Sequence, residues 1–183
     1  IFSDNLKKEK LINFEKDNEQ IFSIVKNYEL YQLLEHDLST NKYFKSKFIA
    51  TKNLSFVNKY DLIVNCDSLS IITKKYFNKK IVKNYNSNAY TTIITHEKIL
   101  NNVAVQIFTS KGPLAFLPIS NTQTSVVYSI PNSISETKKN IEKLIRDKNI
   151  KYKIKNIEKI NNFELRFLNL RLYYHNNILA FGD

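Results

Sequence analysis

Glycine is nearly absent from this chain, whose 183 residues include only Gly112 and Gly182. Loops that bind the phosphates of nucleotides need several glycines at fixed spacing, because the backbone must approach the phosphate closely. The sequence therefore contains neither a dinucleotide-binding fingerprint nor a P-loop.

Cysteine is equally scarce, and methionine is absent. The single cysteine, Cys66, excludes an internal disulfide and a cysteine-based zinc site, and it favours a reducing cytoplasm. The first ten residues lack the order of basic region, apolar core and small residues that marks a signal peptide. No apolar run approaches the roughly 18 residues of a membrane span. Because the chain holds no methionine, even at its first residue, we expect it to be an internal fragment of a longer protein.

Arginine is rare beside lysine. The formal net charge is +11, yet the arginines are only Arg146, Arg166 and Arg171. Surfaces that read nucleic acids usually rely on the forked guanidinium of arginine. The lysines are also spread along the chain, so we expect no nucleic-acid partner. We interpret the charge as a solvated surface, with at most a weak attraction to an anionic membrane face.

The first part of the chain predicts two helices and several short strands. Residues 27–38, NYELYQLLEHDL, repeat leucine at helical spacing and predict an amphipathic helix. Residues 48–50 and 54–57 are expected to form short strands. Residues 60–67, YDLIVNCD, are a short apolar run that suits a buried parallel strand, and residues 70–77 are expected to form a short helix.

The rest of the chain is rich in β-forming residues. Four such runs separated by polar turns predict an antiparallel sheet, at residues 90–95, 103–108, 114–119 and 124–130. Ser133–Glu136, SISE, is a capping box that predicts the start of a helix. Three further strands are expected at residues 151–160, 163–170 and 177–181.

Two of the predicted buried strands lead to an aspartate, Asp67 and Asp183. Open α/β sheets bind ligands at the carboxyl ends of parallel strands. The predicted fold class is therefore α/β, more fully α+β, in which a pair of parallel strands brackets an antiparallel sheet.

Four segments resemble the FAD-dependent aromatic hydroxylases of ubiquinone biosynthesis, within the para-hydroxybenzoate-hydroxylase-like flavin monooxygenases. Residues 101–120, NNVAVQIFTSKGPLAFLPIS, look like the family's middle-domain segment, and residues 178–183, ILAFGD, look like its strand with a Gly-Asp pair. Residues 62–74 and 24–34 match more weakly. The likeness covers essentially the whole chain.

The chain also departs from this family. Ser68 stands where the family has a glycine after its aspartate, and Ile71 and Lys74 stand where it has a serine and an arginine. Tyr28 stands where it has an arginine near the flavin. These changes put tight nucleotide contact by those positions in doubt.

The resemblance implies a fragment of a Rossmann-like FAD-binding fold that carries an antiparallel substrate domain. Its implied boundaries are residues 1–84 for part of the FAD domain, 85–175 for the substrate domain and 176–183 for the returning strand. The implied cofactor is FAD, reduced by NAD(P)H or another reductant. Its reaction with oxygen gives a C4a-hydroperoxide that hydroxylates a polyprenyl phenol ring. Because the glycine-rich fingerprint is missing, we expect this chain alone to be inactive.

The same resemblance suggests binding residues but no catalytic residue. Those expected to contact the cofactor are Gly182, Asp183 and Asp67, although Asp67 could equally make an Asx-type cap on the following helix. Those expected to line the substrate pocket are Gly112, Pro113, Phe116 and Pro118. A tight turn and, for Phe116, an ordinary core position are the other interpretations of this segment.

The remaining reactive residues predict no further site. His36, His96 and His175 show no metal-ligand spacing, and Cys66 is expected to be a small core residue. A His96–Glu97 acid–base pair is discounted because neighbouring strand residues point to opposite faces.

A second hypothesis is a stand-alone basic α+β binding module without catalytic activity. For the enzyme, we expect a cytoplasmic location, with peripheral association at the inner membrane or with a biosynthetic complex as a further option.

Overall fold

The computed structural model describes residues 1–3, 10–16, 19–48, 54–134, 136–149 and 151–182. These residues form two compact units. Unit 1 comprises residues 1–41 and 86–165, and unit 2 comprises residues 42–85 and 166–183. The two long strands β3 (Lys80–His96) and β8 (Asn161–Leu170) each contribute residues to both units.

Unit 1 is built on a mixed, mostly antiparallel sheet. Its strand order is β1-β4-β5-β6-β3-β7, and β8 also pairs with β3. The new strands are β1 (Phe2–Ser3), β4 (Val105–Thr109), β5 (Gly112–Pro118), β6 (Gln123–Pro131) and β7 (Ile154–Ile157). Only the β1–β4 pairing in this path is parallel. The predicted antiparallel sheet is therefore confirmed.

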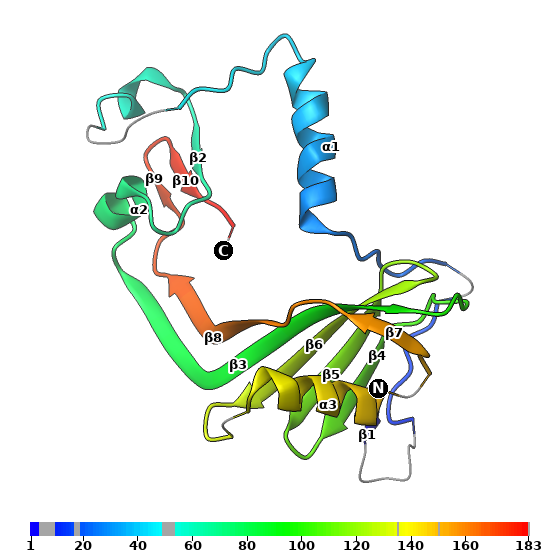
Figure 1. Cartoon of the computed structure of the whole chain (residues 1–183). Helices are drawn as coiled ribbons and strands as arrows, with labels where there is room; N and C mark the ends of the chain where they lie inside the picture. The colour runs from blue at the N-terminus through cyan, green and yellow to red at the C-terminus, as the bar shows by residue number, and fades with distance from the viewer. Residues whose placement is uncertain (4–9, 17–18, 49–53, 135, 150, 183) are drawn as a thin grey trace. The chain divides into compact units, whose positions relative to one another are not determined.

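The core of unit 1 lies between this sheet and helix α3 (Lys138–Lys148), which crosses one face of it in Figure 1. Alternate residues of each strand face the helix, as in Leu114 and Phe116 of β5. On α3, Ile141 and Ile145 are one helical turn apart and are almost fully buried.

Helix α3 begins later than the capping box predicted. Thr137 is the N-cap residue, and its hydroxyl accepts a hydrogen bond from the backbone N–H of Asn140. Glu136, the expected reciprocal partner of Ser133, instead pairs with Lys111. The predicted start at Ser133 is therefore wrong, because an ion pair with a distant turn holds Glu136.

Helix α1 (Asn27–Ser39) confirms the helix predicted from the leucine spacing. None of its residues is buried, and its leucines are 41–60% exposed. The sequence pattern thus identified the helix, but the amphipathic stripe does not pack into a core among the described residues.

Unit 2 holds a small three-stranded sheet in the order β2-β10-β9. The strands are β2 (Ile63–Asn65), β10 (Ile178–Ala180) and β9 (Tyr174–His175). Strands β2 and β10 are parallel, and β9 is antiparallel to β10. The predicted parallel pair is confirmed, although Leu62 just before β2 is 63% exposed and Val64 within β2 is 49% exposed.

Two short helices flank this sheet. The segment predicted as a strand at residues 54–57 instead forms a turn that leads into the 3-10 helix η1 (Val57–Lys59), so that prediction is wrong. Helix α2 (Ile71–Tyr76) confirms the short helix, with Ser70 as its N-cap. Val57, Ile72, Phe77 and Ile178 form the small core between them. The other strand predicted in this region, at residues 48–50, falls largely outside the described residues, and Phe48 itself is not in a strand.

Candidate functional site at the tips of the parallel strands

The parallel pairing of β2 and β10 brings two distant segments to one edge of the small sheet. Ala180 lies opposite Asn65, and the backbone N–H of Phe181 donates to the carbonyl of Asn65 at 3.0 Å. The chain leaving each strand therefore departs from the same edge. Cys66 and Asp67 follow β2 there, and Gly182 follows β10.

Asn65 organises the turn between β2 and α2. Its side-chain N–H group donates to the hydroxyl of Thr73 at 2.8 Å, and its side-chain oxygen accepts from the hydroxyl of Ser70 at 2.8 Å. Thr73 in turn donates to the carbonyl of Asp67 at 2.7 Å. Asn65 and Thr73 are buried, so this network holds the strand tip in one conformation.

Asp67 is exposed and makes a local Asx-type hydrogen bond. Its carboxylate accepts from the backbone N–H of Leu69 at 2.8 Å, while Ser70 caps the helix itself. Asp67 therefore makes an Asx-type turn, which is the structural role that the sequence offered as an alternative to cofactor binding. One carboxylate oxygen is engaged in this turn, and contact with a cofactor stays a prediction.

Gly182 has a backbone conformation that favours glycine. Its φ is +96°, a value that L side chains rarely adopt. A Cβ atom at this position would lie 4.0 Å from the Cβ and the carbonyl oxygen of Cys66, which is ordinary contact. Glycine is therefore needed here for the turn of the chain and not to avoid a clash. Asp183, the other predicted cofactor residue of this strand, lies outside the described residues.

A cavity of about 150 Å³ opens at these strand tips, and we call it the strand-tip cavity. It is lined by Asn65, Cys66, Ser68, Thr73, Lys80, Leu168, Leu170, Tyr173, Ala180, Phe181 and Gly182. Cys66 is exposed, so its predicted place in the core is wrong. Strand β2 ends at Asn65, and the chain turns there before Cys66 could be covered.

The strand-tip cavity has a lining of mixed chemistry. It combines hydroxyl and thiol groups from Ser68 and Cys66, one cation from Lys80, and aromatic surface from Tyr173 and Phe181. Pockets that enclose a whole drug-sized ligand measure roughly 300–1,000 Å³, so this cavity is too small for a complete dinucleotide.

The predicted substrate-binding residues all lie on β5 in unit 1. Gly112 has φ +138°, and a Cβ there would lie 2.1 Å from the carbonyl oxygen of Ser129, so this glycine permits a close approach of two backbones. Phe116 has no exposed surface and packs at 5.6 Å from the ring of Tyr152. Pro113 and Pro118 are half-buried. Their role in a substrate pocket stays a prediction.

The histidines have structural surroundings. His96 is 2% exposed and shares a hydrogen bond of 3.0 Å with the hydroxyl of Thr124, while His175 stacks on Tyr76. His36 lies in the last turn of α1. No group of three histidine, cysteine or acidic side chains that could hold a metal ion occurs in the described part of the chain.

Sequence reasoning missed the residues that shape the strand tip. Asn65 is a polar residue inside an apolar run, and Ser70 and Thr73 have the spacing of a helix cap. Those were the available signals. Lys80, Tyr173 and Phe181 carry no such signal, because they reach the cavity only through the fold.

The comparisons with known proteins identify the fold. No protein-family model matches the chain, and no curated protein matches its sequence. A flavin-dependent halogenase from Xanthomonas campestris is 9% identical, with a TM-score of 0.50 over 67% of this chain and 25% of its own. A tryptophan 6-halogenase from Streptomyces toxytricini is 14% identical, with the same TM-score and the same coverage of 67% and 25%. The tetracycline destructase Tet(51) is 11% identical over 68% of this chain and 38% of its own, with a TM-score of 0.43.

These likenesses concern architecture and only a part of each larger protein. The chain spans about a quarter of the length of each halogenase.

The described part of the chain contains no helix with the length and apolar character of a membrane span. The chain has a mixed α+β fold, and about two thirds of it resembles a part of the two flavin-dependent halogenases.

Proposed function

We propose that this chain is part of an FAD-dependent monooxygenase that hydroxylates the ring of a polyprenyl phenol in ubiquinone biosynthesis. The fold it shares with flavin-dependent enzymes supports the cofactor class. The resemblance of residues 101–120 and 178–183 to aromatic hydroxylases supports the substrate class. The proposed division is residues 1–84 and 176–183 in the FAD domain and residues 85–175 in the substrate domain.

The observation that carries the proposal is the parallel register of β2 and β10. This register places Cys66, Asp67 and Gly182 at the carboxyl ends of neighbouring parallel strands. Open α/β sheets bind their ligands at that edge. Gly182 also lines the cavity without a side chain, so a ligand could approach its backbone closely.

FAD, when bound, would supply the oxygen activation and the transfer of oxygen to the ring. The residues of this chain would bind and orient it. Asp183 would accept hydrogen bonds from a ribityl or ribose hydroxyl, and Gly182 would let the cofactor approach. Asp67 would contribute through the oxygen that does not accept from Leu69. The electrons would come from NAD(P)H or another reductant.

The β5 segment would form a wall against the phenol ring. Pro113 and Pro118 lack amide donors and restrict their own φ, so this strand is stiff. Phe116 supports that wall from the core side, where it is fully buried. A dry, apolar wall suits a flat ring with a polyprenyl tail, with molecular oxygen as the co-substrate. The net charge of +11 would assist a peripheral association with an anionic inner-membrane surface or a biosynthetic complex.

The cofactor part of the proposal is tested in the protein expressed with the sequences that flank this chain in its gene. Asp183→Ala should weaken FAD binding by between a few-fold and about a hundred-fold, the loss of one hydrogen bond. Asp61→Ala is the matched control, because Asp61 is an exposed aspartate just before β2. An unchanged flavin dissociation constant in Asp183→Ala would assign this residue to a turn. Product analysis with a polyprenyl phenol then tests the substrate class.

The 183-residue chain alone should not bind FAD in the micromolar range, because it lacks a glycine-rich phosphate loop. Titration followed by flavin fluorescence measures this. Micromolar binding would contradict the fragment hypothesis. Stop codons on both sides of this stretch in the gene would favour the stand-alone binding module instead.

A further inference from the structure

A second and larger cavity lies in unit 2, between helix α2 and residues 54–58. Its volume is about 500 Å³, and it is lined by Leu54, Ser55, Val57, Asn58, Ile71, Lys75 and Tyr76. We call it the Lys75 cavity. It shares no lining residue with the strand-tip cavity, so a ligand bound in it would not occupy the proposed flavin site.

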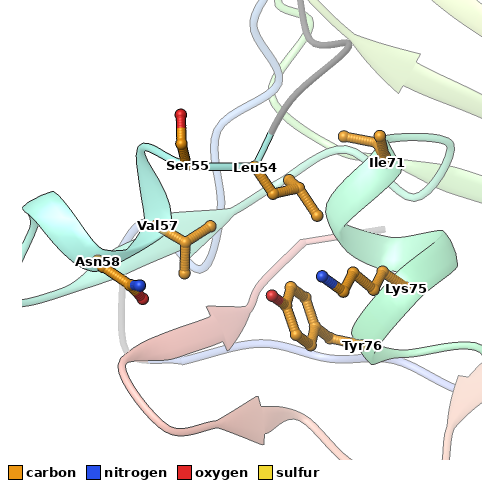
Figure 2. A pocket seen from close by; sticks show the side chains of 7 residues that line it. All are labelled: Leu54, Ser55, Val57, Asn58, Ile71, Lys75 and Tyr76. Atoms are coloured by element: carbon orange, nitrogen blue, oxygen red, sulfur yellow. The ribbon is translucent and has the colours of Figure 1, made fainter.

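The polar groups of the Lys75 cavity converge on one side. Figure 2 shows the ammonium group of Lys75 and the hydroxyl of Tyr76 both directed from α2 into the space facing residues 54–58. The Lys75 ammonium lies 5.1 Å from the centre of the Tyr76 ring, and the ring of His175 stacks on Tyr76 at 4.7 Å. These contacts hold the two donors close together.

The charge of this lining is uncompensated. None of the seven lining residues is acidic, and Lys75 forms no ion pair with any other residue that the structure describes. A carboxylate accepts hydrogen bonds from an ammonium group and a phenol at the same time, and such charge-assisted bonds are the stronger kind.

The lining also includes apolar side chains on both sides of the cavity, with Leu54 and Val57 facing α2 and Ile71 on α2 itself. Leu54, Val57 and Ile71 line the cavity, and Val57 is 5% exposed because it belongs to the small core of unit 2. Packing in this core therefore holds Val57 in place. The volume of the Lys75 cavity, about 500 Å³, lies within the roughly 300–1,000 Å³ range of small-molecule sites.

We propose that the Lys75 cavity binds a small organic carboxylate with an apolar body. The carboxylate would accept hydrogen bonds from Lys75 and Tyr76, and the side-chain amide of Asn58 is a further donor on the lining. The apolar body would rest against Leu54, Val57 and Ile71. An inorganic anion would gain only the hydrogen bonds with Lys75 and Tyr76. A neutral analogue would gain only the apolar contacts.

Benzoate is the probe for this proposal, with benzamide as its neutral counterpart and inorganic phosphate as the anion without an apolar body. The full 183-residue chain is titrated with each and followed by amide chemical shifts. Benzoate should shift the amides of Val57, Ile71 and Tyr76, and it should bind at least about ten-fold more tightly than benzamide or phosphate.

Two adjacent lysines provide a matched pair of variants. Lys75→Gln should weaken benzoate binding about ten-fold or more, whereas Lys74→Gln should leave it unchanged, because both lysines are exposed but only Lys75 lines the cavity. Tyr76→Phe keeps the ring that stacks on His175 but removes the hydroxyl, so it should weaken benzoate binding a few-fold. Circular dichroism confirms that each variant is folded.

Three outcomes would overturn the proposal. The first is equal affinity for benzoate and benzamide, which would show that the negative charge is not recognised. The second is equal affinity for benzoate and phosphate, which would show that the apolar side chains do not contribute. The third is an equal effect of Lys74→Gln and Lys75→Gln, which would show that benzoate responds only to the general positive charge of the surface.

Discussion

Ala180 lies directly opposite Asn65 in the parallel pairing of β10 with β2, although the two residues are far apart in the sequence. Because of this register, the chain segments that follow β2 and β10 leave the sheet at the same edge. The side chain of Asn65 then fastens the turn to helix α2 through Ser70 and Thr73.

Asn65→Ala should loosen this turn. The change removes the hydrogen bonds of Asn65 to the hydroxyls of Ser70 and Thr73, and each such bond contributes about 0.5–1.5 kcal/mol to stability. Hydrogen exchange at the amides of residues 71–76 should accelerate accordingly. The control is Asn78→Ala, which removes an exposed asparagine just beyond α2. Equal exchange rates in the two variants would show that the network does not stabilise the strand tip.

The amides of residues 60–66 should exchange faster than those of residues 103–108. Strand β4 is paired on both sides, with β1 and β5, and its Ile107 is 4% exposed. Strand β2 is at the edge of its sheet, and Leu62 and Val64 leave apolar surface in water. Native-state hydrogen exchange measured by mass spectrometry compares the two segments. Slower exchange in residues 60–66 would contradict the order expected from burial.

Phe116→Ala should destabilise unit 1 by about 3–5 kcal/mol, because Phe116 is fully buried and packs on Tyr152. Phe108→Ala, which truncates a 45% exposed phenylalanine on neighbouring β4, is the control and should cost much less. Urea denaturation measures both. In the flavin-loaded full-length protein, Phe116→Ala should also release more hydrogen peroxide per reductant consumed if β5 lines the substrate pocket. Unchanged coupling would leave Phe116 as a core residue only.

Gly112→Ala should disrupt the β4–β5–β6 region more than Gly182→Ala disrupts its own turn. Both glycines have positive φ, but only at Gly112 would the new Cβ meet a backbone oxygen, that of Ser129, at 2.1 Å. The strain of φ alone costs on the order of 1 kcal/mol, and the clash adds to it. Local hydrogen exchange around each position measures the two effects. A larger effect at Gly182 would contradict the geometry.

The Lys111–Glu136 pair should make unit 1 sensitive to acid. The hydrogen bond from Lys111 is the main cause that lowers the pKa of Glu136 below its ordinary 4.5, and a bond with Asn140 adds to it. A lowered folded-state pKa contributes stability that is present above pH 4.5 and is lost as the pH falls through the folded value. The stability difference between wild type and Glu136→Gln should therefore be largest near neutral pH and shrink below pH 4.5. A constant difference across this range would contradict the assignment.

Local pattern in the sequence was sufficient for most elements. The leucine spacing at residues 27–38 predicted α1, and the β-rich runs predicted β4 to β6 and the last part of β3, because backbone periodicity depends on near neighbours. The first part of β3, from Lys80, was not predicted. The two short apolar runs that lead to Asp67 and Asp183 predicted the parallel pair correctly. Local pattern misled where a distant group competes, as at Glu136, which pairs with Lys111 instead of closing a capping box.

The site depended on tertiary structure. The sequence indicated that Gly182 and Asp67 follow strands, but only the register of β2 with β10 brought Cys66, Lys80 and Tyr173 around one cavity. The Lys75 cavity likewise arises because η1 packs beside α2, and no spacing along the chain encodes that contact. By itself, the sequence determined which segments form helices and strands, since propensity and periodicity act within a few residues. Only the tertiary structure decided which faces are buried and which side chains meet, since those depend on packing between segments far apart in the chain.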